Sequence, residues 1–344
     1  MRSVIFNHHG GPEVLVMADM PIPIVKKGHA LVKLSAAALN RMDIFVRNGW
    51  PGLKLELPHI PGADGAGEIL ALGDETNGWN TGDHVVINSN LGCGDCEWCK
   101  KGLDNLCTNW HLLGETVRGT YTEIISIPVR QLYKLPQDFS YEVAAASGLV
   151  FLTAWHSLIT KGKLSPGETV LIIGASGGVN TASIQIAKFY NARVIVVGST
   201  PEKLELAESL GADNLVLRTP NEDWSKTVYN LTSKKGVDIV VDNVGTTFPL
   251  SLRSLRKGGR LLTVGNTVSP RFEIDNRYIF GKHLTIIGST MGTISDFSTV
   301  MDLITTGKLH PAISKVYPLS KARQAHEHLE SGKNLGKVVL SIAE

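Results

Sequence analysis

The chain has 344 residues, which is enough for two domains that each bury a core of their own. Its composition, with 43% hydrophobic and 19% charged residues and 35 glycines, is that of an ordinary globular protein and suits a loop-rich α/β enzyme. A formal net charge of +2 gives no electrostatic basis for binding nucleic acid or an anionic membrane.

We expect no membrane-spanning or secretory segment. No apolar run approaches the roughly 20 residues needed to cross a bilayer. The N-terminus, Met1–Phe6, lacks the apolar stretch of a signal peptide. The protein is therefore predicted to be cytoplasmic and to act on a small molecule, without a nucleic-acid or membrane partner.

Residues 1–140 are predicted to be mostly β. The segments Ala30–Ser35 and Asp83–Asn88 alternate apolar and polar residues, which is typical of half-buried strands. Turn residues such as Gly10–Pro12 separate these runs. Such a region cannot belong to a doubly wound parallel sheet, so we expect a separate, barrel-like domain.

All four cysteines of the chain fall within fifteen residues, at positions Cys93, Cys96, Cys99 and Cys107. This spacing is typical of a closed tetrahedral zinc site, whereas disulfides are uncommon in a cytosolic chain. Four thiolate ligands leave no open coordination position, so such a site has a structural role and cannot bind substrate. The sequence predicts one structural zinc in a lobe over residues 92–108.

A catalytic zinc would then need histidine or carboxylate ligands. His326 and His328 lie on a charged helical stretch, and His59 is the only histidine near a carboxylate, Asp64, in a glycine-rich loop. A loop histidine bonded to backbone groups is the simpler interpretation of His59.

A glycine-rich turn follows the first strand of the second half of the chain. Val170–Ile173 is a short run rich in β-branched residues, which favours a strand buried on both faces. Gly177 and Gly178 come next, and a helix follows, so its free N–H groups could hold the pyrophosphate of a dinucleotide. Ala175 and Asn180 stand where the usual fingerprint has glycines, and alone the pattern also fits an ordinary strand-to-helix turn.

Further buried strand runs, separated by helical segments, follow at Arg193–Val197, Val237–Val241 and Arg260–Val264. This alternation predicts βαβ units and a doubly wound parallel sheet. We expect this dinucleotide-binding domain to cover residues 141–295, and residues 296–344 to return to the first domain.

The end of the second strand bears on the choice of cofactor. An NAD site usually places a carboxylate there to bind the ribose 2′-OH. Ser199 and Thr200 instead offer hydroxyls and Lys203 offers a cation, which favours the 2′-phosphate of NADP, although a solvated helix lysine is the other interpretation of Lys203. The cofactor is predicted to be NADPH. The expected cofactor-binding residues in this half of the chain are Ser176, Gly177, Gly178, Val179, Ser199, Thr200, Lys203, Asn243 and Gly265.

Along nearly its whole length, the sequence resembles the medium-chain dehydrogenase/reductase superfamily. The resemblance rests on segments in that family's order, namely residues 37–43, 57–67, the cysteine lobe, 152–155, the Gly-Gly-Val turn, 210–213 and 336–340. It implies a GroES-like catalytic β-barrel at residues 1–140, a Rossmann domain after it, and assembly into a homodimer or homotetramer.

The zinc alcohol dehydrogenases of this superfamily hold a catalytic zinc on Cys, His and Cys, and the matching positions here are Asn40, Ala63 and Leu149. None of the three ligands is kept. The chain instead resembles the quinone oxidoreductase and enoyl reductase branch, which needs no catalytic metal. That resemblance implies that Asn40 and Thr153 are catalytic and that Lys337 lies near the cofactor. Asn40 would lie nearest the nicotinamide ribose or the substrate carbonyl, and Thr153 would hydrogen-bond the nicotinamide end.

Three functions follow as hypotheses. The first is an NADPH-dependent reductase of quinones or of activated C=C bonds, including enoyl- or acryloyl-CoA-like thioesters, because without a Lewis acid the acceptor must take hydride readily. The second is a zinc-type alcohol dehydrogenase with a non-standard metal site at Asp43, His59 and Asp64. The third is a non-catalytic NADPH-binding protein.

Overall fold

The computed structural model describes residues 1–220, 222–269 and 271–342. The chain forms two compact units, each described here by itself. Unit 1 comprises Met1–Leu149 and Thr293–Glu344, and unit 2 comprises Val150–Gly292. Helix α3 (Tyr141–Trp155) begins directly after the boundary expected at residue 140, and the two units divide within this helix.

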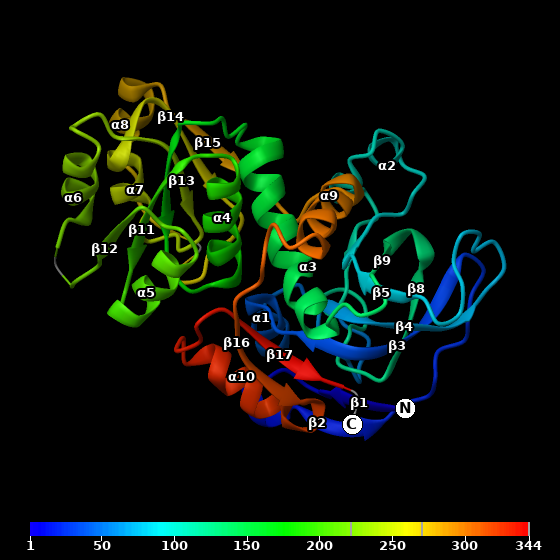
Figure 1. The fold of residues 1–344 in the computed structure, drawn as a ribbon. Coiled ribbons are helices and arrows are strands. Elements are labelled where there is room, and N and C mark those ends of the chain that lie inside the picture. The colour runs from blue at the N-terminus through cyan, green and yellow to red at the C-terminus, as the bar shows by residue number, and fades with distance from the viewer. Residues whose placement is uncertain (221, 270, 343–344) are drawn as a thin grey trace. The chain divides into compact units, whose positions relative to one another are not determined.

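Unit 1 is built on a seven-stranded sheet in which β16, β17, β3, β4, β5 and β9 follow one another and β8 also pairs with β3. The strands are β3 (His29–Ala38), β4 (Asp64–Leu72), β5 (His84–Ile87), β8 (Ile124–Pro128), β9 (Leu132–Lys134), β16 (Ile313–Pro318) and β17 (Lys337–Ser341). The last strand of the chain, β17, pairs antiparallel with β3, as the red and blue strands of Figure 1 show. Residues from the two ends of the sequence therefore meet in one sheet.

The smaller elements of unit 1 lie around this sheet. They are β1 (Arg2–Ile5), β2 (Val16–Asp19), α1 (Arg41–Asn48), β6 (Asn90–Leu91), α2 (Glu97–Lys100), β7 (His111–Leu112), α9 (Ile294–Thr305) and α10 (Ala322–Glu330). Helix α1 starts at Asn40, where the Asp43 carboxylate accepts a hydrogen bond from the Asn40 N–H, and it ends at Gly49, whose φ of 75° suits glycine. The core includes Phe6, Val32, Leu34, Ile69, Val85, Ile87 and Leu340.

Unit 2 is a six-stranded parallel sheet with the order β12-β11-β10-β13-β14-β15. Its strands are β10 (Thr169–Ile173), β11 (Arg193–Gly198), β12 (Asn214–Leu217), β13 (Val237–Asp242), β14 (Leu255–Thr263) and β15 (Thr285–Gly288). The order reverses between β10 and β13, which is the pattern of a Rossmann fold. The doubly wound sheet predicted from the sequence is confirmed.

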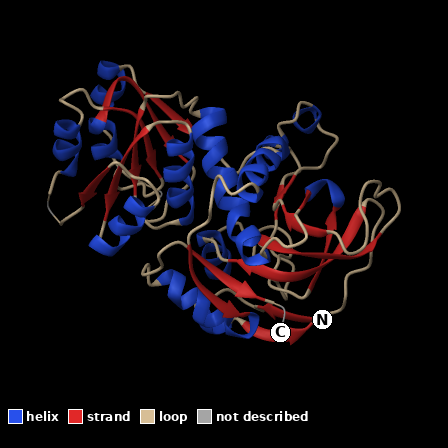
Figure 2. Ribbon diagram, in the orientation of Figure 1, coloured by secondary structure: helices blue, strands red, loops and turns tan. Residues whose placement is uncertain are grey.

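Helices flank this sheet, as Figure 2 shows. They are α4 (Gly178–Phe189), α5 (Pro201–Ser209), α6 (Trp224–Leu231), α7 (Phe248–Ser254) and α8 (Asn276–Lys282), together with the end of α3 and the π-helix His156–Lys161 that continues it. On one face, Trp224 and Val228 of α6 and Leu252 of α7 join the strand residues Leu171 and Ile195 in a buried cluster.

One expectation about apolar segments was wrong. Among the described residues, the helical segment Tyr141–Lys161 has 21 residues and a mean hydropathy of 1.5, so by length and composition alone it is able to cross a bilayer. However, 78% of the most apolar 18-residue window of this segment is buried inside the protein. An apolar helix buried in this way is usual for the core of a globular protein.

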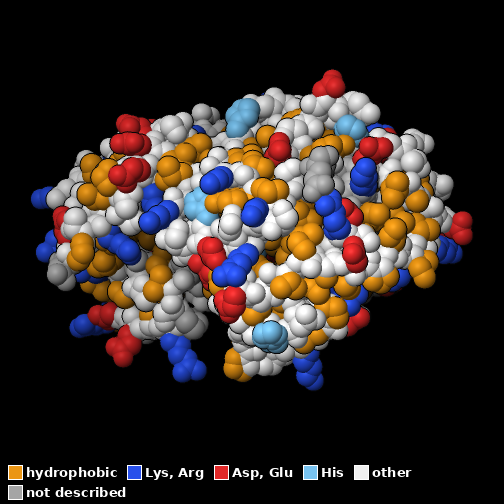
Figure 3. Space-filling view, turned by 90° about the horizontal axis from the view of Figure 1, so that it is seen from below, with side chains coloured by type: hydrophobic (Ala, Val, Ile, Leu, Met, Phe, Trp, Pro, Cys, Tyr) orange, Lys and Arg blue, Asp and Glu red, His pale blue; other side chains and the backbone are white. Residues whose placement is uncertain are grey.

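Charged side chains of both signs are interspersed on the face of the molecule in Figure 3. This mixture agrees with the formal net charge of +2.

Candidate active site and metal lobe

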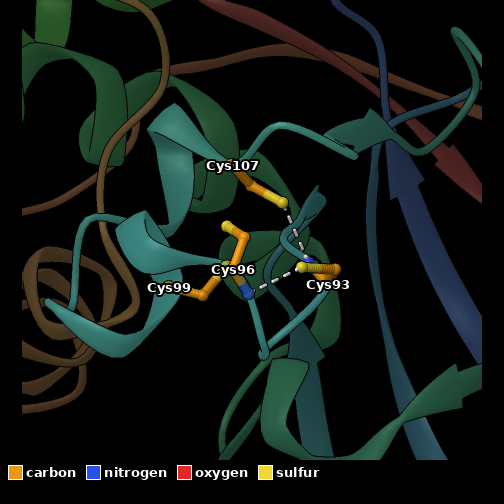
Figure 4. Close-up of side chains that lie close together, drawn as sticks. All are labelled: Cys93, Cys96, Cys99 and Cys107. Atoms are coloured by element: carbon orange, nitrogen blue, oxygen red, sulfur yellow. Dashed lines mark hydrogen bonds between the residues drawn. The ribbon is translucent and has the colours of Figure 1, made fainter.

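The four cysteines converge in one lobe of unit 1. Cys93 precedes α2, Cys96 is the residue before that helix, Cys99 lies within it, and Cys107 follows the next 3-10 helix. Their sulfur atoms lie within 4.8 Å of one another, as drawn in Figure 4. Tetrahedral Zn–S bonds of about 2.3 Å place sulfur atoms about 4 Å apart, so this arrangement fits a closed zinc site.

Backbone N–H groups in the lobe support the thiolate form of the cysteines. Cys93 Sγ accepts from the N–H of Cys96 at 3.4 Å, and Cys107 Sγ accepts from the N–H of Cys93 at 3.2 Å. Such donors stabilise thiolates, which are the form of cysteine that binds a metal. The ligand set therefore fits the predicted structural zinc.

A buried carboxylate ties this lobe to helix α9. Asp104 lies between Cys99 and Cys107 in sequence, and its Oδ1 accepts from the N–H of Ile294, the first residue of α9, at 3.0 Å. Its Oδ2 accepts from the Asn90 side chain at 2.7 Å. Burial raises the pKa of Asp104, while these donors act in the opposite direction. Asp104 was not predicted as a functional residue from the sequence.

A second buried polar cluster forms around Asp64 in the sheet of unit 1. Lys337 Nζ donates to Asp64 Oδ2 at 3.0 Å, to Asn40 Oδ1 at 2.7 Å and to the carbonyl of Leu39 at 2.7 Å. Asn40 Nδ2 donates to Asp64 Oδ2 at 2.9 Å. The exposed fractions are only 4% for Lys337, 7% for Asn40 and 1% for Asp64. The cluster therefore joins an ammonium, a carboxamide and a carboxylate away from water.

Asp64 also contacts two of the three positions, Asn40, Ala63 and Leu149, that the resemblance matches to zinc ligands. It follows Ala63 in the chain, it accepts from the side chain of Asn40, and its Oδ1 accepts from the N–H of Leu149 at 2.7 Å. A side chain at position 148 would lie 2.6 Å from Asp64 Oδ1, so Gly148 permits this close approach. The side chains at the three positions are an amide, a methyl and an isobutyl group, none of which is a zinc ligand.

Asp43 and Tyr121 extend this cluster. Tyr121 Oη donates to Asp43 Oδ2 at 2.9 Å, and the Asn40 N–H donates to the same oxygen at 2.8 Å. Burial is the main cause that raises the pKa of Asp43 to about 6, and it also raises the pKa of Tyr121. Gly62, with a φ of 101°, leaves room for the Tyr121 ring, because a Cβ there would lie within 2.5 Å of its carbons.

The alternative metal site at Asp43, His59 and Asp64 does not assemble. His59 Nε2 donates to the carbonyl of Gly114 at 3.1 Å, and burial lowers the pKa of His59. Asp64 already faces the Lys337 ammonium. Within the described part of the chain, the four cysteines are the only group of three or more His, Cys, Asp or Glu side chains whose ligand atoms converge for a metal. The catalytic zinc of the alcohol dehydrogenases does not fit these residues.

In unit 2, the glycine turn between β10 and α4 brings together Ser176, Gly177, Gly178 and Val179 at the start of a twelve-residue helix. The departure at Asn180 has a physical reason. Its Nδ2 donates to the carbonyl of Ile173 at 3.0 Å, and a Cβ on Gly174, whose φ is 102°, would lie 2.4 Å from that nitrogen. The Asn180 side chain therefore fills the space beside the turn.

Asn243 and Gly265 follow β13 and β14. Asn243 Oδ1 accepts from the N–H of Val264 at 2.9 Å, but its buried Nδ2 has no partner among the described residues. A buried donor without a partner at the carboxyl end of a parallel strand fits a ligand group at that place. Gly265 is exposed, and no atom lies within 4 Å of the position of a Cβ there.

The end of β11 carries the residues expected at an NADP 2′-phosphate. Thr200 caps α5, where its hydroxyl accepts from the N–H of Lys203 at 3.4 Å, and Lys203 Nζ lies 3.5 Å from Ser199 Oγ. Arg218, which was not predicted from the sequence, follows the neighbouring strand β12, and its backbone N–H donates to the carbonyl of Gly198 at 2.7 Å. Only the pairing of β12 with β11 brings Arg218 to this strand end.

Thr153 lies in α3 within unit 2, with 4% of its surface exposed. Its Oγ1 lies 3.9 Å from the sulfur of Met291. The two expected catalytic residues belong to different units, Asn40 to unit 1 and Thr153 to unit 2.

Comparison with known proteins identifies the family. The GroES-like domain of alcohol dehydrogenases matches residues 26–137, and the zinc-binding dehydrogenase family matches residues 178–306. An NAD-dependent alcohol dehydrogenase of Sulfolobus acidocaldarius is 33% identical over 99% of this chain and 100% of its own. The chain belongs to the medium-chain dehydrogenase/reductase superfamily. The GroES-like domain and the Rossmann sheet expected from the sequence are thereby confirmed.

Other members of the superfamily that match this one carry different names. The human quinone oxidoreductase and the acryloyl-coenzyme A reductase of Metallosphaera sedula are each 31% identical over 99% of this chain, which covers 97% and 100% of those proteins. A crystal structure of an NAD-dependent alcohol dehydrogenase shares 42% identity and a TM-score of 0.96, with 100% of both chains covered.

A cobalt- and zinc-bound alcohol dehydrogenase from Pyrobaculum aerophilum is also similar in structure, with 29% identity, a TM-score of 0.90 and 99% of both chains covered. This medium-chain dehydrogenase/reductase is therefore an oxidoreductase of small molecules, in a family that implies zinc and a nicotinamide cofactor.

Proposed function

We propose that this protein is an NADPH-dependent reductase that transfers hydride to a quinone, or to a C=C bond conjugated to a carbonyl or thioester, without a catalytic metal. The observation that carries the proposal is the environment of Asp64. The resemblance matches Asn40, Ala63 and Leu149 to the zinc ligands of the alcohol dehydrogenases. Asn40 and Leu149 donate to this carboxylate and Ala63 precedes it in the chain, but none of the three is a zinc ligand.

The choice of acceptor follows from the absence of a Lewis acid among the proposed catalytic groups. Reduction of an unactivated ketone needs an electrophile on its oxygen, which zinc supplies in related enzymes. A quinone or a conjugated C=C accepts hydride from C4 of the dihydronicotinamide more readily, because the negative charge is delocalised onto oxygen. A proton from solvent then completes the reduction.

The cofactor preference is proposed from the end of β11. Ser199 and Lys203 offer a hydroxyl and a cation there, and the backbone of Arg218 lies beside this strand end, which together suit a phosphate better than a neutral ribose hydroxyl. Replacing Lys203 with alanine is expected to raise the KM for NADPH about tenfold and to leave the KM for NADH unchanged. Lys226→Ala, which removes an exposed lysine of α6, is the matched control.

The cysteine lobe is proposed to hold one structural zinc per chain, and the chain is proposed to form a homodimer. Strand β15 lies at the edge of the sheet of unit 2, and Ile286 on it is 40% exposed. Nearby Phe280 is 66% exposed. Open edges with exposed apolar residues are commonly covered by a partner strand.

Three measurements test the proposal together. NADPH oxidation is followed with a panel of quinones, enones and enoyl-CoA thioesters, alcohol oxidation is followed with NAD and NADP, and metal content is determined. We expect turnover in the first panel and about one zinc per chain.

Alcohol turnover with two zinc ions per chain would overturn the proposal in favour of an alcohol dehydrogenase, the name that several of the similar proteins carry. NADPH binding without turnover of any acceptor would leave only a binding role.

A further inference from the structure

We propose that Lys337 is a positioning residue that acts through Asn40 and Asp64, and that it does not bind the cofactor. Its ammonium supplies the resident positive charge of the site at which related enzymes place a zinc ion. This inference rests on the proposed metal-free function and assigns the part that Lys337 plays in it.

The first argument is that Lys337 has no donor left for a ligand. An ammonium has three N–H donors. The carbonyl of Leu39, the Asn40 Oδ1 and the Asp64 Oδ2 accept them at 2.7, 2.7 and 3.0 Å. Lys337 is also only 4% exposed. A cofactor phosphate would have to break one of these bonds to reach the ammonium.

The second argument is that Asp64 depends on this ammonium. Apart from Lys337, the donors to the Asp64 carboxylate among the described residues are both neutral, the Asn40 amide and the Leu149 N–H. A buried carboxylate with neutral donors alone is costly, and removal of one partner of a buried ion pair leaves an uncompensated charge. Lys337 therefore places a compensating positive charge 3.0 Å from the buried Asp64 carboxylate.

The third argument concerns the orientation of Asn40. Its carbonyl oxygen faces the ammonium and its NH2 faces the carboxylate, so a rotated amide would point its NH2 at a cation and its oxygen at an anion. The ion pair thus fixes one orientation of the amide at the N-terminus of α1. Lys337 lies on β17 and Asp64 lies on β4. Both strands pair with β3, which ends two residues before Asn40, so the two charges can fix the amide between them.

The test compares kcat and the KM for NADPH in Lys337→Met, Lys337→Arg and the matched control Lys333→Met, which removes an exposed lysine four residues away. For Lys337→Met we expect kcat to fall at least tenfold, with the KM for NADPH within twofold of wild type. Lys337→Arg should recover part of kcat. The control should leave both constants unchanged.

A small primary alkylammonium ion added to Lys337→Ala should raise kcat in a saturable way, because it replaces the missing ammonium group. It would not repair a folding defect. The double variant Asp64→Asn/Lys337→Met keeps the inference testable if the single variant does not fold. Without a buried unpaired charge it should be as stable as wild type and still have the low kcat.

A raised KM for NADPH with unchanged kcat would overturn the inference and make Lys337 a cofactor ligand. That result can be told apart from failure of the proposed function. If alcohols prove to be the substrates, kcat and the KM for the cofactor can be compared in the same way with alcohols. If no substrate is turned over, the dissociation constant of NADPH decides. An unchanged value in Lys337→Met supports the inference, and a weaker affinity contradicts it.

Discussion

The carboxyl group of Asp43 is buried where water does not solvate its charge. Burial raises its pKa to about 6, even though Tyr121 and the N–H of Asn40 donate to it. In the unfolded chain the pKa of an aspartate is about 3.9. A carboxyl group whose pKa rises on folding stabilises the protein most when protonated, so its contribution is present below about pH 4 and is lost as the pH rises through 6.

Replacing Asp43 with asparagine should remove this pH dependence. Between pH 4 and pH 6 the free energy of unfolding of the wild type should fall relative to that of Asp43→Asn by about 2–3 kcal/mol, because only the wild type must ionise a buried acid. Urea unfolding at several pH values measures the difference. Glu205→Gln, which changes an exposed carboxylate, serves as the control. A constant difference across this range would show that Asp43 ionises as freely in the folded protein as in the unfolded one.

Gly174 is the residue on which the turn before α4 depends. Its φ is 102°, and a Cβ there would lie 2.4 Å from Asn180 Nδ2. Gly174→Ala should therefore destabilise the protein by about 3 kcal/mol and weaken NADPH binding, since both the backbone conformation and the Asn180 contact are lost. Thermal unfolding and a fluorescence titration measure the two effects. Gly281→Ala, at a position with open space around it, should leave both unchanged.

The signals that the sequence carries at the residue scale are local. The zinc ligands could be predicted because all four cysteines lie within fifteen residues. The partners of Lys337 could not, because Asn40 and Asp64 are 297 and 273 residues away and only the pairing of β17 with β3 and of β3 with β4 brings them together. Asn180 looked like a defect in the glycine pattern, and only the path of its side chain explains it.

At the scale of elements, the buried strands of unit 2 were the easiest to predict. The strands β10, β11 and β13 each contain an apolar run, namely Val170–Ile173, Val194–Val197 and Ile239–Val241, since both faces of a parallel sheet are covered. Arg218 could not be predicted as a neighbour of Ser199, because the sequences of β11 and β12 do not show which residues of the two strands pair.

One backbone N–H at the N-terminus of helix α9 has its hydrogen-bond acceptor in the cysteine lobe. Asp104 accepts from the N–H of Ile294, one of the groups at a helix start that have no partner within the helix. Removal of zinc with a chelator should loosen the lobe and raise the rate of hydrogen exchange at Ile294–Phe297. Hydrogen exchange with mass spectrometry measures this rate.

Asp104→Leu separates the two parts of this argument. The variant should keep its zinc, because all four cysteines remain, but α9 should exchange as fast as in the zinc-free protein. Unchanged exchange in both samples would mean that the Thr293 and Asp296 caps hold this helix by themselves.

At the scale of the whole molecule, the proposed dimer uses one edge strand of the sheet in unit 2, β15, and leaves the other, β12, outside the interface. Ile286→Lys places a charge on the exposed edge strand β15 and should convert the dimer to a monomer, as measured by light scattering coupled to gel filtration. Leu217→Lys places the same charge on the opposite edge strand, β12, and should leave the dimer intact. Dissociation by the β12 variant alone would assign the interface to the other edge.

The position of β17 in the sheet has a consequence for biosynthesis. Asn40 and Asp64 are translated well before Lys337, which lies 273 residues after Asp64 in the chain. While those residues are made, the nascent chain carries the Asp64 carboxylate without its counter-ion. The sheet of unit 1 reaches its final charge balance only when β17 has been translated and pairs with β3.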